Sequence, residues 1–174
     1  MMKKITLLII ALVFSISFVN AQSYTLSWEG VTLGDTVTIS GDPANMELVF
    51  HAILTNNSEN TVTFDMKRRL IYLLDSTATS YCWGHGCSIP NPDSIVIARD
   101  TVILAPGGST SEEGFSGHYV NEDWNKPIGA IGTSLIEYTF FNVDNEDEFV
   151  TVVAKFVTAP DGVIDQIMAD GFDQ

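Results

Sequence analysis

Apolar side chains recur at every second position over most of this chain. This is the period of a β-strand with one buried face, because successive side chains of a strand point to opposite faces of the sheet. The clearest runs are residues 24–28, 46–54, 62–66, 136–140 and 150–156. Helical spacing is confined to the last segment of the chain. The alternation therefore predicts an all-β fold.

Turn-forming residues separate these runs at short intervals. The turns are expected at the Gly, Pro, Asn and Asp clusters of residues 41–43, 56–60, 91–93, 106–108 and 144–147. The pattern gives about eight or nine short strands, which is typical of a sandwich or a barrel and not of alternating α/β units. We expect one antiparallel β-sandwich domain over residues 22–158.

The two ends of the chain are expected to lie outside this domain. Residues 1–21 have the basic start, the apolar stretch and the small final residue of a secretory signal peptide. The apolar stretch is shorter than the ~20 residues of a membrane span, so we expect export without a transmembrane segment. Residues 159–174 are interpreted as an acidic tail or a short amphipathic helix, with an apolar stripe over residues 163–168.

The charge balance excludes one class of partner. The chain has 8 Lys and Arg against 22 Asp and Glu, for a net charge of −14. Removal of residues 1–21 takes away Lys3 and Lys4, which leaves 6 basic groups against 22 acidic groups and a balance of −16. Nucleic-acid binding needs clustered cations, so we expect no nucleic-acid partner. Anionic lipid surfaces should repel the chain.

The only two cysteines, Cys82 and Cys87, lie close together in the sequence. An exported chain with two such residues is expected to join them in a disulfide. Closing so small a ring contributes on the order of 2 kcal/mol, so the bond should shape a local loop more than it stabilises the domain. Redox chemistry through the pair, and a zinc site that adds His85, are alternatives. Four residues separate the pair where a redox motif has two, and no fourth zinc ligand lies nearby.

Candidate catalytic residues are few. Residues 114–118 approach the Gly-x-Ser-x-Gly nucleophile elbow, but His118 stands where the last glycine belongs and the context is a strand. His51, His85 and His118 are the only histidines. The acidic run 144–148 lacks the spacing of an EF-hand, so a solvated hairpin tip is expected there, with adventitious calcium as the alternative. We therefore expect no catalytic residue, cofactor or resident metal.

Two further groups of residues need an interpretation. Lys67, Arg68 and Arg69 are expected to form a solvated, twisted or bulged strand segment that pairs with the chain's own acids, and docking of an acidic partner is the alternative. The second group consists of ring-bearing side chains in or beside loops, and it forms a candidate binding loop. Its members are Tyr81, Trp83, His85, Tyr119 and Trp124. Core packing of the aromatic rings is the competing interpretation.

Four segments together resemble immunoglobulin-like modules of secreted Bacteroidota proteins. They are residues 54–58, residues 81–84 with Cys87, residues 115–119 and residues 136–140. The resemblance extends over residues 24–158. It implies an immunoglobulin-like sandwich and transfers no active site.

These observations lead to one expected function and two alternatives. We expect an exported, noncatalytic binding or adhesion-type module, periplasmic or extracellular, with a protein or glycan partner at the cell envelope. A polysaccharide-binding module is the first alternative, and it requires Trp83 and Trp124 to be exposed and roughly coplanar. A hydrolase is the second alternative. It requires His85 or His118 beside a serine or a carboxylate in a concave pocket.

Overall fold

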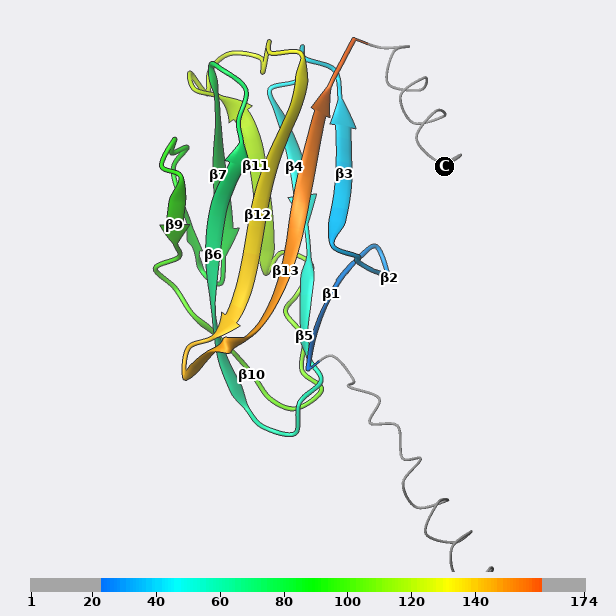
Figure 1. The fold of residues 1–174 in the computed structure, drawn as a ribbon, viewed down its shortest axis with the longest axis vertical. Helices are drawn as coiled ribbons and strands as arrows, with labels where there is room; N and C mark the ends of the chain where they lie inside the picture. Colours follow the sequence, from blue (N-terminus) through cyan, green and yellow to red (C-terminus); the bar gives the residue numbers. More distant parts are fainter. Residues whose placement is uncertain (1–22, 161–174) are drawn as a thin grey trace, which may run out of the picture.

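The computed structural model describes residues 23–160, and within that range all regular structure is β (Figure 1). The strands are β1 (Tyr24–Trp28), β2 (Val31–Thr32), β3 (Thr36–Gly41), β4 (Glu47–His51), β5 (Ile53–Asn56), β6 (Val62–Tyr72), β7 (Thr77–Trp83), β8 (Gly86–Cys87), β9 (Ile95–Ile97), β10 (Val102–Leu104), β11 (Phe115–Asn121), β12 (Gly132–Asn142) and β13 (Asn145–Thr158).

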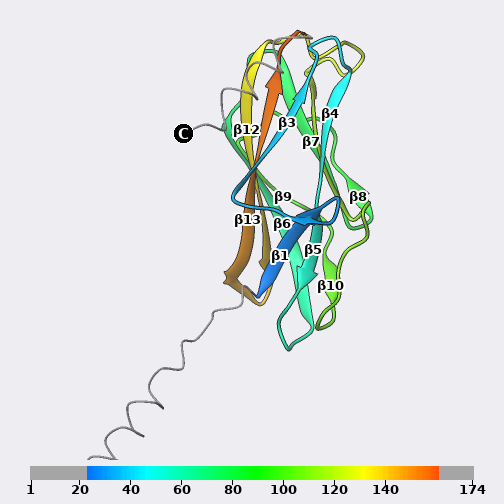
Figure 2. The same ribbon diagram turned by 90° about the vertical axis from the view of Figure 1, so that its right-hand side faces the viewer.

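The strands form two facing layers (Figure 2). One layer has the order β10-β6-β12-β13-β3, and β9 also pairs with β6. The other layer contains the sheet β4-β11-β7-β8 and the sheet β2-β1-β5, and β5 follows β4 after one residue. The predicted all-β, immunoglobulin-like sandwich is confirmed as a fold class.

The strand count and one pairing differ from the prediction. Residues 23–160 form 13 strands because the run 46–54 divides into β4 and β5 at Ala52, and because four strands have only two or three residues. The pairing of β13 with β3 is parallel, whereas all other pairs are antiparallel. Alternation of side chains does not encode strand direction, so the sequence pattern could not reveal this pair.

Aromatic rings from both layers fill the space between them. Phe115 of β11 packs edge to face against Tyr138 and Phe140 of β12, with ring centroids 4.9 and 5.0 Å apart. Phe50 of β4 and Trp83 of β7 extend this cluster. All five side chains are buried. Such pairs stabilise a core by about 0.5–1.5 kcal/mol each beyond the burial of their area.

The prediction of a solvated segment at residues 67–69 is wrong for Arg68. Arg68 is fully buried between the layers, because it continues the inward face of β6 set by Phe64 and Met66. Its guanidinium donates to the Thr79 carbonyl and hydroxyl oxygens on β7, and also to the carbonyl oxygens of Asn91 and Asp93. Burial lowers the pKa of Arg68. The side chain thus joins the two layers.

The flanking residue Arg69 behaves as predicted. It points outward and makes two hydrogen bonds of 2.8 Å to the carboxylate of Glu137. The predicted bulge lies further along, since the register between β6 and β12 shifts where Leu135 faces Tyr72 and Ile136 faces Leu70. Strand β6 therefore passes through the basic segment without interruption.

Glu148 at the start of β13 gives the fold a predicted acid sensitivity. Asn142, Tyr24 and Asn145 donate hydrogen bonds to its carboxylate and lower its pKa below the ordinary 4.5. A carboxyl with a lowered pKa stabilises the fold above its unfolded pKa, and this contribution is lost as the pH falls through the folded pKa. Between neutral pH and about pH 3, the free energy of unfolding should therefore fall less in Glu148→Gln than in the wild type. Urea unfolding at the two pH values measures this difference. An equal loss in both proteins would contradict this role.

Two predicted segments cannot be compared with the structure. The signal peptide, residues 1–21, and nearly all of the acidic tail or short helix, residues 159–174, lie outside the described residues. Between residues 23 and 160, no helix is long and apolar enough to cross a membrane.

Candidate functional site

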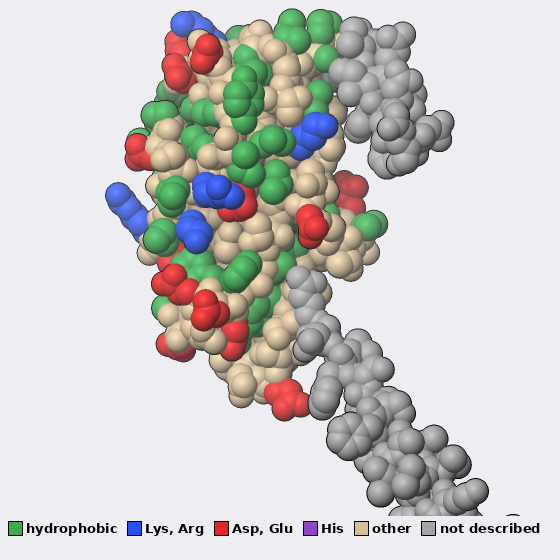
Figure 3. Space-filling model, viewed as in Figure 1, with side chains coloured by type: hydrophobic (Ala, Val, Ile, Leu, Met, Phe, Trp, Pro, Cys, Tyr) green, Lys and Arg blue, Asp and Glu red, His purple; other side chains and the backbone are tan. Residues whose placement is uncertain are grey.

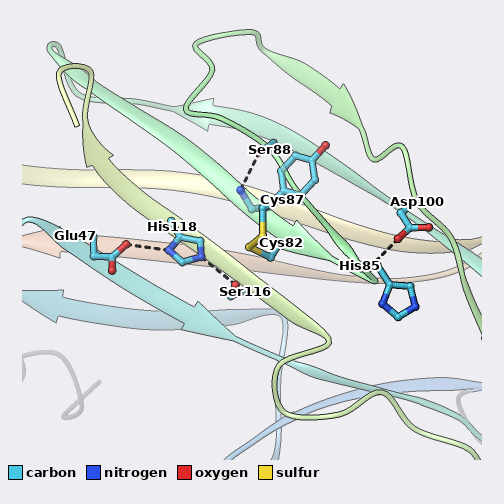
Figure 4. Close-up of a disulfide and its surroundings, with 9 residues drawn as sticks. Glu47, Cys82, His85, Cys87, Ser88, Asp100, Ser116 and His118 are labelled. Atoms are coloured by element: carbon cyan, nitrogen blue, oxygen red, sulfur yellow. Dashed lines mark hydrogen bonds and ion pairs between the residues drawn. A yellow bond between two sulfur atoms is a disulfide. The ribbon is translucent and has the colours of Figure 1, made fainter. Parts of the chain in front are cut away.

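The predicted disulfide between Cys82 and Cys87 is confirmed. The two residues lie directly opposite each other on β7 and β8, with a sulfur–sulfur distance of 2.04 Å (Figure 4). Gly84 and His85 connect the strands, and Gly84 has a φ of 60°, which favours glycine. We call residues 82–90 the flap. A Cβ at Gly84 would also lie 2.9 Å from a carboxylate oxygen of Asp100.

Hydrogen bonds hold the flap in place on both sides. The His85 N–H donates to Oδ2 of Asp100 at 2.7 Å, which ties the flap tip to the segment between β9 and β10 (Figure 4). The Gly84 N–H donates to the Gly114 carbonyl at 3.2 Å. At the flap base, the Tyr81 N–H donates to Oγ of Ser88 at 3.0 Å. The flap is thus positioned by three separate contacts in addition to the disulfide.

The structure buries most of the aromatic rings of the candidate binding loop. Tyr81, Trp83 and Tyr119 are at most 5% exposed, whereas Trp124 is 71% exposed and His85 is exposed. The reason is strand alternation, which turns residues 81 and 83 of β7 and residue 119 of β11 toward the core. A coplanar sugar platform of Trp83 and Trp124 is therefore contradicted, because the ring of Trp83 is covered.

A shallow hollow lies on the outer face of the sheet β4-β11-β7-β8, beside the flap. Its volume is about 420 Å³, and we call it the sheet hollow. Three large apolar side chains at this hollow are exposed, namely Met46 at 48%, Ile89 at 81% and Trp124 at 71%. Its remaining walls include the disulfide and His118. The flap and the segment after β11, which the sequence analysis singled out separately, thus meet at one place.

Three polar side chains form a hydrogen-bonded series next to the sheet hollow. Nδ1 of His118 lies 3.0 Å from a carboxylate oxygen of Glu47, and Nε2 lies 2.9 Å from Oγ of Ser116 (Figure 4). An acid, an imidazole and a hydroxyl in this order can in principle activate the hydroxyl as a nucleophile. Ser116 is only 8% exposed, however, and β11 is paired on both sides, so its backbone N–H groups are committed to the sheet.

Ser116 and His118 stand out in the sequence as candidate catalytic residues, whereas Glu47 does not. Residues 116 and 118 lie two apart on a strand, so their side chains share a face. Glu47 belongs to β4, and only the register of β4 against β11 brings it to His118. No local sequence signal carries that register. His118 therefore lies beside both a serine and a carboxylate, the neighbours that the hydrolase alternative requires.

A second hollow lies on the other side of the flap, between it and β9. Its volume is about 460 Å³, and we call it the edge cavity. Its lining includes Tyr81 and Trp83 of β7, Ile97 of β9, and the charged residues Arg99 and Asp100. Cys87, Ser88 and Ile89 line both hollows. The flap is therefore the wall between them.

Metal ligands do not converge in the part of the chain that the structure describes. No group of three or more His, Cys, Asp or Glu side chains there could hold a metal ion. At the predicted acidic hairpin tip, Glu148 instead accepts hydrogen bonds from Asn142 and Asn145. The candidate site therefore consists of the flap and its two hollows.

Comparisons with known proteins support the fold alone. No protein-family model matches the chain, and no match was found among curated proteins. Among solved structures, the N-terminal domain of PorA is similar, with 16% identity, a TM-score of 0.56, and coverage of 80% of this chain and 99% of that one. A PapD-like domain of human CEP192 has 9% identity and a TM-score of 0.41, covering 84% and 92% of the two chains. The periplasmic chaperone SfaE has 7% identity and a TM-score of 0.38, covering 80% and 57%.

Proposed function

We propose that this protein is an exported, noncatalytic binding module that holds a protein partner at the sheet hollow. The observation that carries the proposal is the grouping of Met46, Ile89 and Trp124, all exposed, around one hollow. Exposed apolar side chains gathered at one place mark interaction sites, and tryptophan is enriched among the residues that dominate binding energy. The disulfide keeps the flap, and with it Ile89, in a fixed position.

A protein partner fits this surface better than a glycan does. Sugar-binding sites commonly use aromatic faces, and of the four aromatic candidates only Trp124 is exposed. Ile89 and Met46 offer apolar surface suited to the side chains of another protein. The rim also carries the carboxylate of Glu47, which is half exposed. Location in the periplasm or outside the cell is part of the proposal and is supported by the disulfide.

The test compares the capture of partners by the native protein and by surface variants. We expect Trp124→Ala and Ile89→Ala each to reduce co-purification of the bound envelope protein about tenfold, the loss typical of a central interface residue. Ile103→Ala is the matched control, since Ile103 is 68% exposed but belongs to β10 in the opposite layer. Equal capture by all three variants would contradict the proposed surface.

Hydrolysis is a second candidate function, favoured by the Glu47–His118–Ser116 series. Hydrolysis is the weaker candidate because Ser116 has limited exposure. A substrate carbonyl needs access to the serine hydroxyl and to free N–H donors. An esterase assay with p-nitrophenyl acetate separates the two functions. Turnover by the wild type that disappears in Ser116→Ala, with the fold intact, would overturn the noncatalytic proposal.

A further inference from the structure

We propose that the edge cavity binds a small amphipathic carboxylate, with its apolar body between the flap and β9 and its anionic group at Arg99. This site lies on the other side of the flap from the sheet hollow, and it does not depend on the proposed protein partner. Its volume of about 460 Å³ falls in the range of about 300–1,000 Å³ that small-molecule sites occupy.

The apolar part of the cavity comes from both layers of the sandwich. Trp83 and Tyr81 of β7 belong to the lining but are at most 5% exposed, so most of the accessible apolar surface comes from Val96 and Ile97 of β9. Ile97 is 55% exposed although it belongs to a strand, so part of this lining is presented to solvent. A ligand placed against it would remove apolar surface from water, which is the main driving force for binding at such sites.

The polar part of the cavity points to an anion. Within residues 23–160, Arg99 makes no hydrogen bond or ion pair, and its side chain is exposed at the lining. Tyr81 lines the same cavity and is only 5% exposed. Burial raises the pKa of Tyr81, and the positive charges of Arg68 and Arg99 oppose that rise. Arg99 is thus the exposed donor that the lining offers to an anion.

The one acid in the lining is already engaged. Asp100 accepts the His85 N–H with one carboxylate oxygen and the Thr101 N–H with the other. Its charge is therefore partly compensated by backbone donors, whereas the charge of Arg99 is not. A guanidinium recognises a carboxylate through parallel hydrogen bonds, which favours a carboxylate over a neutral or cationic head group.

The experiment titrates dodecanoate, below its micelle concentration, into the oxidised protein and measures affinity by calorimetry. We expect Arg99→Gln to weaken binding about tenfold and Arg99→Lys to retain most of it. Lys67→Gln is the control, because Lys67 has the same charge but lies on β6 outside the cavity lining. Dodecanol, the neutral probe, should bind with the same affinity to the wild type and to Arg99→Gln.

Amide chemical shifts locate the bound probe. We expect dodecanoate to perturb residues 81, 83, 91 and 96–100 and to leave the β3 amides unchanged. The proposal is overturned if dodecanoate does not bind, if Arg99→Gln binds as tightly as the wild type, or if Lys67→Gln loses as much affinity as Arg99→Gln. Capture of the protein partner should be the same for Arg99→Gln and wild type, so failure of either proposal is recognised separately.

Discussion

Replacement of Arg68 with alanine should destabilise the folded protein by about 3 kcal/mol or more, a loss typical of breaking a buried polar network. The guanidinium lies between the layers and donates to oxygen atoms of Thr79, Asn91 and Asp93. Alanine would leave these buried or half-buried acceptors without a donor and would leave a large void. An unmade hydrogen bond of a buried group costs about 1–3 kcal/mol.

The size of this effect can be checked against a neighbour. Arg69→Ala removes an exposed ion pair with Glu137, and exposed pairs contribute little to stability because solvent screens them. Urea unfolding of the two variants should therefore give clearly different midpoints with similar slopes. Similar midpoints for the two variants would mean that Arg68 does not join the layers.

Replacement of Asn56 with alanine should cost about 3 kcal/mol, because one fully buried side chain satisfies several backbone groups. Its amide nitrogen donates to the carbonyl oxygens of Asn60 and Leu104, at 2.8 and 2.9 Å. Its carbonyl oxygen accepts the N–H and hydroxyl of Ser58. These bonds fix the turn between β5 and β6 against the end of β10.

Thermal unfolding provides the measurement for Asn56, and Asn60 provides the control. The Asn60 side chain is exposed, and its backbone carbonyl rather than its side chain accepts the bond from Asn56. Asn60→Ala should therefore change the unfolding free energy by about 0.5 kcal/mol or less. A melting temperature for Asn56→Ala near that of Asn60→Ala would show that the turn does not depend on this network.

Alternation predicted where strands lie and which side chains enter the core. It also carried information that the charge of Arg68 obscured: residues 62, 64 and 66 face inward, so residue 68 faces inward as well. The same alternation along β7 places Trp83 in the core, on the same face as Tyr81. For Arg68, residue type suggested exposure and strand position decided burial, whereas for Trp83 strand position agrees with the core-packing interpretation.

Features of the site differ in how far local sequence determines them. The disulfide joins residues five positions apart, so the hairpin that brings them together is short and was predictable. The contact of Glu47 with His118, and the cavity that Arg99 and Tyr81 both line, connect residues from different hairpins. They depend on strand order and register, which a single sequence with alternating polarity does not specify.

Site-specific photo-cross-linking in the native envelope is the most direct test of the central claim that a protein partner binds at the sheet hollow. A photoreactive phenylalanine analogue is placed at Ile89 or Trp124 beside the sheet hollow, or at Ile103 in the opposite layer. We predict that both positions at the hollow form one cross-linked product of the same mass, and that position 103 forms none. Strong cross-linking at position 103 with none at 89 and 124 would contradict the account.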